Sequence, residues 1–207
     1  MYRNRIRIRP FAPAVVGAAI LTLSVAACEG ESPVSPGESQ GTMEAVVRDD
    51  PGAAAGPAMS PARAFASGGF EANARIQVFL DGAWQDVNGL SSVDVRAELQ
   101  GGEETVGSAT VEARTYDRAR VVLTDARSRL DGDTNIGVGP AGVSVTLSIA
   151  GGGEVIVEHD QPVTVEGGGT TRVVLDLNSH VWLSEGALES GAVARSTFES
   201  AATVRVE

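Results

Sequence analysis

Residues 76–87 read Ile76-Gln-Val-Phe-Leu-Asp81-Gly82-Ala-Trp-Gln-Asp-Val87, which places two apolar segments on either side of one Asp-Gly pair. Such a pair supplies the positive φ angles that a type I′ turn requires, and this turn matches the twist of two paired strands. The stretch therefore predicts a β-hairpin whose turn lies at Asp81-Gly82.

Further along the chain, apolar and polar residues alternate as they do in half-exposed strands. Three segments show this alternation most clearly: 93–99, 143–149 and 173–177. Glycine-rich stretches at 101–102, 151–153 and 167–169 have the spacing of turns. Many short alternating segments predict an all-β domain, an antiparallel β-sandwich of about nine to eleven strands, with a closed barrel as the alternative.

Two segments, 121–123 and 155–157, are apolar at every position, which predicts strands covered on both faces. Residues 186–197 are the only candidate for a helix, and Gly191 in its interior weakens it. Helices are therefore expected to contribute little to the fold.

Two stretches resemble a β-sandwich domain found in bacterial lipoproteins, a family whose function is unknown. One is Tyr116-Asp-Arg-Ala-Arg120-Val-Val-Leu123, which is similar to a "Tyr-x-x-x-Arg-hydrophobic" strand of that family. The other, 163–176, is similar to its Gly-rich hairpin and "Val-Leu-Asp" strand. The resemblance covers about residues 84–183, and it implies the fold without supplying an activity.

The start of the chain has the features of a secretory signal. Four arginines within the first nine residues precede the uncharged run 11–27, which ends in Ala26-Ala27-Cys28. This ending resembles the lipobox of bacterial lipoproteins, in which the cysteine receives a diacylglyceryl group and becomes the first residue after cleavage. The resemblance implies lipidation of Cys28, the only cysteine. An uncleaved anchor, the alternative, would need about 20 apolar residues.

These features divide the chain into a signal peptide at 1–27, a flexible tether at 28–69 and a β-sandwich domain at 70–207. The tether prediction rests on the abundance of Gly, Ser, Pro and Ala, because such a segment buries too little apolar area to fold. The apolar patch 43–47 inside it is interpreted as part of the linker, with a short helical turn or a docking motif as the alternative. The lipobox resemblance implies the bacterial cell envelope as the location. In that family an Asp after the cysteine retains some members in the inner membrane, so the resemblance, with Glu29 at this position, implies the outer membrane.

The charge of the chain argues against one class of partner. Sixteen arginines and no lysine face 27 acidic residues, which gives a net charge of −11, and removal of residues 1–27 would leave 12 basic against 27 acidic residues. A surface of this kind repels phosphate backbones, so nucleic-acid binding is not expected. Attachment to a membrane would come from the acyl chains.

No catalytic signature is present, and we predict that the protein is not an enzyme. The chain has two histidines, His159 and His180, and no Gly-x-Ser-x-Gly elbow. A zinc site needs three or four ligands, for which the chain has too few histidines and no free thiol after lipidation. Trp84 and Trp182 are interpreted as core or half-core residues, with an aromatic platform for sugars as the alternative.

The segment Asp131-Gly-Asp133-Thr-Asn135-Ile136-Gly137 has oxygen-bearing side chains at alternate positions, as calcium loops do. It departs from the EF-hand pattern because Ile136 stands at the sixth position, where glycine belongs, and Gly142 stands at the twelfth, where glutamate belongs. Asp131, Asp133 and Asn135 are therefore weak candidate metal ligands. We interpret the segment as a polar turn and predict no cofactor, with Ca²⁺ as the alternative.

The sequence thus favours a tethered, non-catalytic envelope module that binds a protein or glycan partner or serves a structural role. A calcium-dependent adhesion or carbohydrate-binding module is the second hypothesis. An envelope hydrolase is the third.

Overall fold

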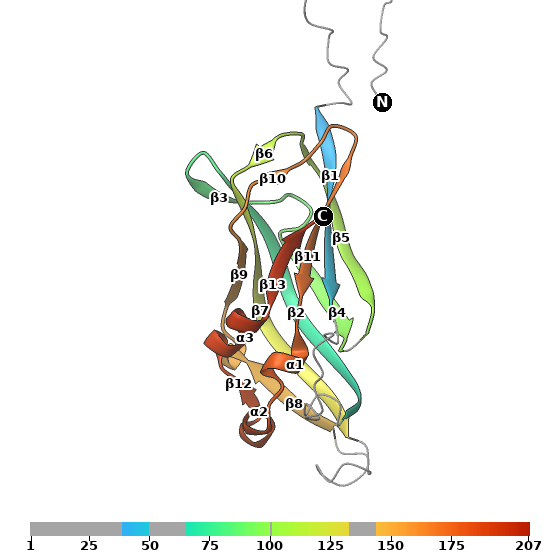
Figure 1. The fold of residues 1–207 in the computed structure, drawn as a ribbon, viewed down its shortest axis with the longest axis vertical. Coiled ribbons are helices and arrows are strands. Elements are labelled where there is room, and N and C mark those ends of the chain that lie inside the picture. The colour runs from blue at the N-terminus through green and yellow to red at the C-terminus, as the bar shows by residue number, and fades with distance from the viewer. Residues whose placement is uncertain (1–38, 50–64, 100, 133–143) are drawn as a thin grey trace, which may run out of the picture. The chain divides into compact units, whose positions relative to one another are not determined.

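The computed structural model describes residues 39–49, 65–99, 101–132 and 144–207 (Figure 1). These ranges hold thirteen strands, three short helices and a 3₁₀ turn at Ala150–Gly152. The prediction of an all-β, sandwich-like fold is confirmed. Three of the strands are only two residues long, too short to produce a readable alternation, and the sequence accordingly predicted fewer.

The first sheet contains four strands in the order β13-β11-β1-β5. They are β1 (Gln40–Arg48), β5 (Glu103–Glu112), β11 (Thr170–Asp176) and β13 (Thr203–Val206). Strand β1 lies between β5, with which it is antiparallel, and β11, with which it is parallel. The expected antiparallel arrangement thus has an exception here, and β12 beside β8 is a second.

Strand β1 corrects the predicted domain boundary. It lies inside the segment 28–69 that was assigned to the tether, and β2 also begins before residue 70, at Phe65. Met43, Ala45 and Val47 are at most 2% exposed and belong to the core. The patch 43–47 is thus part of an interior strand, which pairs with β11 on one side and with β5 on the other. Local composition could not reveal this strand, because it depends on partners that are distant in sequence.

The second sheet is built on two long antiparallel strands, β2 (Phe65–Leu80) and β7 (Arg118–Gly132). Beyond β2 lie β3 (Ala83–Asp86) and β4 (Val93–Glu98), and beyond β7 lie β8 (Ser144–Ile149) and β9 (Val155–His159), with β12 (Ala192–Val193) next to β8. The predicted hairpin is present: Asp81 and Gly82 have φ angles of 52° and 80°, and Leu80 pairs with Ala83.

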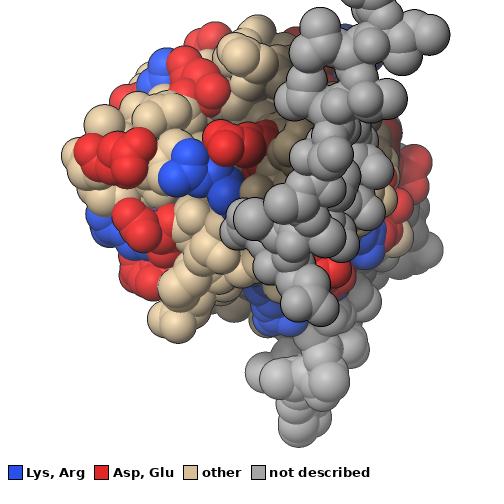
Figure 2. Space-filling model, turned by 90° about the horizontal axis from the view of Figure 1, so that it is seen from above, with Lys and Arg blue, Asp and Glu red and all other residues tan. Residues whose placement is uncertain are grey.

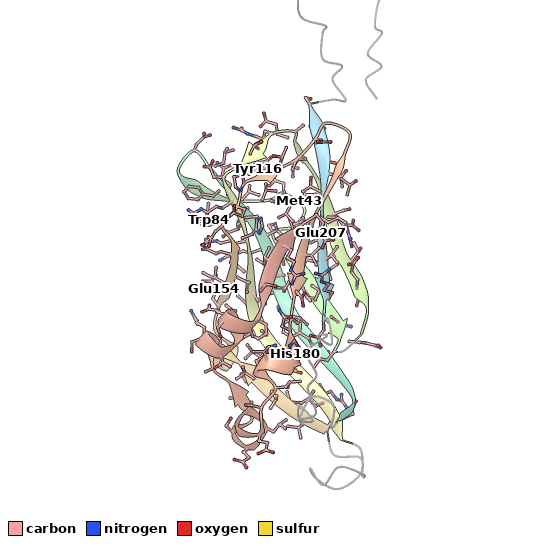
Figure 3. The ribbon with its side chains drawn as sticks, viewed as in Figure 1. Met43, Trp84, Tyr116, Glu154, His180 and Glu207 are labelled. Atoms are coloured by element: carbon pink, nitrogen blue, oxygen red, sulfur yellow. The ribbon has the colours of Figure 1, made fainter. Side chains whose placement is uncertain are left out.

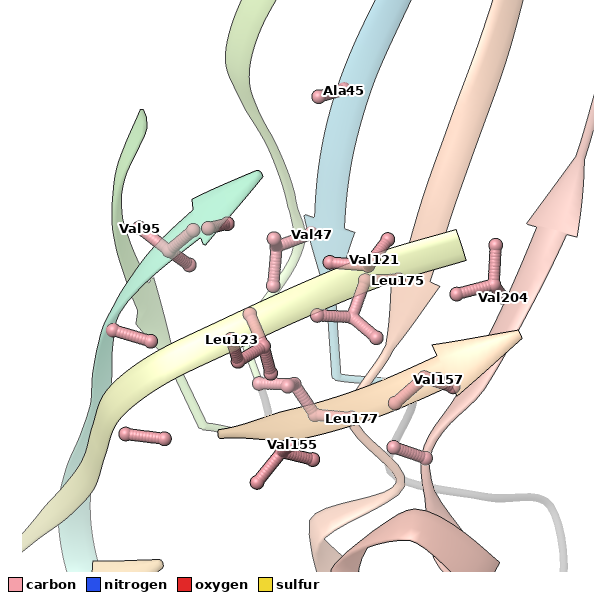
Figure 4. Packing of buried hydrophobic residues seen from close by; sticks show 14 of the residues in the cluster. Ala45, Val47, Val95, Val121, Leu123, Val155, Val157, Leu175, Leu177 and Val204 are labelled. Carbon is pink, nitrogen blue, oxygen red and sulfur yellow. The ribbon is translucent and has the colours of Figure 1, made fainter. Parts of the chain in front are cut away.

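The inward faces of the two sheets form one hydrophobic core (Figure 4). Val47 and Leu175 come from the first sheet, whereas Val121, Leu123 and Val155 come from the second, and each is at most 2% exposed. A fully buried side chain of this size stabilises the fold by about 1.5–3 kcal/mol. Val122 points to the opposite face of the strand from its neighbours Val121 and Leu123, and it is buried as well. This agrees with the prediction that segment 121–123 is covered on both faces.

The predicted helix at 186–197 is two helices, α2 (Glu185–Ser190) and α3 (Arg195–Ala201), separated at Gly191, whose φ of 68° ends α2. A third helix, α1 (Ser179–Trp182), precedes them. Trp182 is fully buried, and its ring lies 5.5 Å from that of Phe198 in α3. The helical segment therefore contributes its aromatic side chains to the core.

A two-stranded sheet joins β6 (Thr115–Tyr116) to β10 (Val163–Thr164) (Figure 1). Tyr116, labelled in Figure 3, is buried, and its hydroxyl donates a 3.0 Å hydrogen bond to the carbonyl of Glu112. This bond ties the end of β5 to β6, four residues later, in the manner of a tyrosine corner.

Candidate functional site

The residues selected from the sequence as candidate metal ligands are only partly within the described ranges. Asp133 and Asn135 lie outside them, as does Cys28. Asp131 is exposed near the end of β7, accepts a 2.6 Å hydrogen bond from the Ser144 hydroxyl and lies 3.6 Å from Arg129 Nε. Among the residues that the structure describes, no cluster of three or more His, Cys, Asp or Glu side chains could bind a metal ion.

The two histidines occupy different elements. His159 is in β9, with Nδ1 3.1 Å from the Val204 carbonyl of β13, so it links the edges of the two sheets. His180 is in the short helix α1. No helix among the described residues is sufficiently long and apolar to span a bilayer.

The two tryptophans have different environments. Trp182 is buried, as predicted, and its Nε1 donates to the Leu177 carbonyl over 2.8 Å. Trp84, labelled in Figure 3, is only half-buried. It lies on the outer face of the second sheet, where Phe79 is its partner in the strand register. The interpretation of both as core or half-core residues thus fits Trp182 fully, whereas Trp84 is half-buried on the face of the sheet opposite to that of the core residues Ile76 and Val78.

A row of polar side chains crosses four strands beside Trp84. Asp86 in β3 accepts a 2.7 Å hydrogen bond from Gln77 in β2, and Gln77 accepts one of 2.7 Å from Arg120 Nε in β7. Arg120 also reaches Glu158 in β9, with 3.4 Å between Nη1 and Oε1. These four residues are mutual partners in the strand register, which holds Arg120 in a fixed position across the sheet.

The aromatic rings lie under two guanidinium groups. Phe79 and Trp84 meet edge to face, with 5.2 Å between centroids. The Arg120 guanidinium carbon lies 4.1 Å from the Trp84 centroid, and that of Arg118 lies 4.5 Å from Phe79 and 5.3 Å from Trp84. Each such contact stabilises the pair by about 0.5–2 kcal/mol and favours a guanidinium position over the ring. We call Phe79, Trp84, Arg118 and Arg120 the Trp84 surface.

Arg118 differs from its neighbours in having hydrogen-bond donors to spare. Its side chain is 36% exposed, and its ion pair with Glu158 spans 3.8 Å. The guanidinium donates no hydrogen bond to any residue that the structure describes. A guanidinium carries five N–H donors in a planar fork suited to a carboxylate. Arg118 is thus oriented by stacking and available to an external acceptor.

Two other exposed arginines are engaged by carboxylates. Arg172 on the first sheet pairs with Glu44, Glu103 and Glu207. Arg127 donates two hydrogen bonds to Glu71, and the Arg127 hydrogen bond and charge lower the pKa of that carboxyl group. Charges of both signs are interspersed in this way on the face shown in Figure 2. The position over the Phe79 and Trp84 rings, rather than the lack of a donated hydrogen bond by itself, distinguishes Arg118.

An open hollow lies elsewhere on the same sheet, where the register of β7 shifts near Asp125. Its polar lining contains both signs of charge: Glu71, Asn73, Asp94, Arg96, Asp125 and Arg127. Within this hollow, Glu71 and Arg127 are paired with one another.

Part of the Trp84 surface could be predicted from the sequence. Alternation in 118–121 puts Arg118 and Arg120 on one face of a strand, and the hairpin puts Phe79 opposite Trp84. The missing information was that β2 pairs with β7, which places Arg118 opposite Phe79 across about 40 residues of chain.

No protein-family model matches the chain, and neither the curated proteins nor the solved structures include a match. The resemblance to lipoproteins and to their β-sandwich domain therefore stays a prediction.

Proposed function

We propose that the protein is a lipid-anchored module of the bacterial cell envelope that binds a partner without catalysis. The anchor is supported by the basic and apolar start of the chain and by the small residues before its only cysteine, Cys28. Metabolic labelling with a fatty-acid analogue tests the anchor. The label is expected on the wild-type protein and absent from Cys28→Ser, and a label retained by the variant would contradict the assignment.

The observation that carries the binding role is the exposed guanidinium of Arg118, which is stacked on Phe79 and donates no hydrogen bond within the described residues. Half-exposed aromatic rings beside arginine are typical of the residues that dominate binding interfaces. No catalytic role is assigned to this surface, since it contains neither a nucleophile nor a general base next to one.

Retention of the full-length protein on purified envelope material of the source bacterium tests the binding role. The envelope material is extracted with detergent and immobilised on a surface. Because the extraction removes the bilayer into which the acyl chains would insert, the lipid anchor does not contribute to retention. We expect Trp84→Ala and Arg118→Ala to lower retention about tenfold, while Arg127→Ala, on the same sheet but paired with Glu71, leaves it unchanged. Equal retention of all four proteins would show that the Trp84 surface is not the binding site.

A further inference from the structure

We propose that the Trp84 surface binds the carboxylate of an acidic sugar in a polysaccharide. This inference rests on the proposed binding function and names its ligand class. Its starting point is the Arg118 guanidinium, whose carbon lies over the Phe79 ring at 4.5 Å from the centroid and which donates no hydrogen bond to a described residue. A planar fork of donors binds a carboxylate with two parallel hydrogen bonds.

The flanking acidic groups distinguish a carboxylated sugar from a more highly charged anion. Asp86 and Glu158 close the two ends of the polar row, and both are accessible to solvent. Their charge offsets that of Arg118 and Arg120, and the whole chain carries −11. A phosphate or sulfate polymer would be repelled by this environment. A sugar ring with one carboxylate has the lowest charge density of these anions.

The same acidic groups match the hydroxyls of a sugar. Each hydroxyl needs an acceptor for its hydrogen, and ionised carboxylates are strong acceptors. Asp86 and Glu158 supply them on either side of the arginines, while the half-exposed rings of Phe79 and Trp84 offer apolar contact to the C–H groups of the sugar. Charge, hydroxyl acceptors and aromatic area are thus within one surface of four adjacent strands.

Binding calorimetry with the full-length protein in detergent tests this inference. The probes are an oligogalacturonate and its fully methyl-esterified form, which differ only in the carboxylate. We expect the oligogalacturonate to bind, the ester to bind at least tenfold more weakly, and the affinity to fall as salt is added. Dextran sulfate, which combines sugar rings with a higher charge density, is expected to bind more weakly than the oligogalacturonate.

Variants assign the effect to Arg118. Arg118→Ala is expected to weaken oligogalacturonate binding about tenfold or more, and Arg118→Lys to restore part of it, because lysine keeps the charge without the planar fork. Arg127→Ala is the matched control and should leave the affinity unchanged. The melting temperatures of these variants separate loss of binding from loss of fold. Addition of the oligogalacturonate should also change the tryptophan fluorescence of the protein. This change should be absent from Trp84→Phe, in which the buried Trp182 is the remaining tryptophan.

Three outcomes would overturn the carboxylate assignment: equal binding of the ester, preferred binding of dextran sulfate, or no binding of the oligogalacturonate. If Arg118-dependent retention on envelope material persists in any of these cases, the proposed binding function stands with another ligand. If that retention is also absent, both proposals fail.

Discussion

The carboxylate of Asp49 accepts two hydrogen bonds from Ser179, one from the backbone nitrogen over 2.8 Å and one from the hydroxyl. Both residues are 1% exposed. Asp49 directly follows β1, and Ser179 begins α1, so the pair joins the early strand to the helical segment across 130 positions of sequence. The bond to the nitrogen satisfies one of the N–H groups that a helix leaves unpaired at its start.

Replacement of Asp49 by alanine is expected to destabilise the fold by about 2 kcal/mol, because it removes a helix cap and leaves buried donors of Ser179 unsatisfied. Urea unfolding measures this change. Ser179→Ala should cost less, since it keeps the bond to the nitrogen. The double variant should show a coupling of about 0.5–3 kcal/mol between the two sites. Additive effects would indicate that the two residues act independently.

Truncation tests the role of β1. A fragment of residues 34–207 is expected to unfold in one cooperative thermal transition, because it retains all strands of both sheets. A fragment of residues 65–207 lacks β1 and leaves β5 and β11 without the strand between them. We expect it not to fold cooperatively, as measured by circular dichroism. A cooperative transition in the shorter fragment would show that β1 is dispensable.

Much of the fold could be predicted locally. The turn followed from the pair Asp81-Gly82, and strands β4 and β8 followed from alternation, because one face of each is more buried than the other. The segment 173–177 was also predicted as a half-exposed strand, but in β11 residues 173–176 are buried on both faces. Strand β1 could not be predicted, since its stability comes from β5 and β11, which are distant in sequence. The Trp84 surface could not be predicted for the same reason. The sequence indicates Trp84 as a candidate, but only the pairing of β2 with β7 brings Arg118 beside it.

The two tryptophans are expected to differ sharply in their contribution to stability. Trp182→Ala removes a fully buried side chain packed against Phe198 and should cost about 3–5 kcal/mol. Trp84→Ala removes a half-buried ring from the outer face, and its cost is expected to be about 1–2 kcal/mol, mainly its contacts with Phe79 and the arginines. Denaturant unfolding of both variants measures the difference. Equal costs would contradict the assignment of Trp84 to a surface.

The Tyr116 hydroxyl gives a prediction about alkaline pH. Burial, followed by the nearby Glu112 carboxylate, raises the pKa of Tyr116 above its ordinary value of 10. Because the folded state holds the proton more tightly than the unfolded state, this stabilisation is fully present below pH 10 and decreases as the pH rises towards the folded-state pKa. Tyr116→Phe should lose about 1 kcal/mol at neutral pH, with its hydrogen bond to Glu112. It should also remove part of the alkaline decline in unfolding free energy, which urea titrations between pH 8 and 11 would measure.

Calcium is expected to leave the melting temperature unchanged. Asp131 already accepts a hydrogen bond from Ser144 and pairs with Arg129, so a cation would have to compete with both. Binding to the native state alone would add about 2.7 kcal/mol at a free Ca²⁺ concentration one hundred times the dissociation constant, which is a rise of several degrees for a domain of this size. Thermal melts in millimolar Ca²⁺ and in chelator test this, with Asp131→Ala as the control. A rise that chelator reverses and that Asp131→Ala abolishes would establish a calcium site at the end of β7, and with it the calcium-dependent adhesion hypothesis.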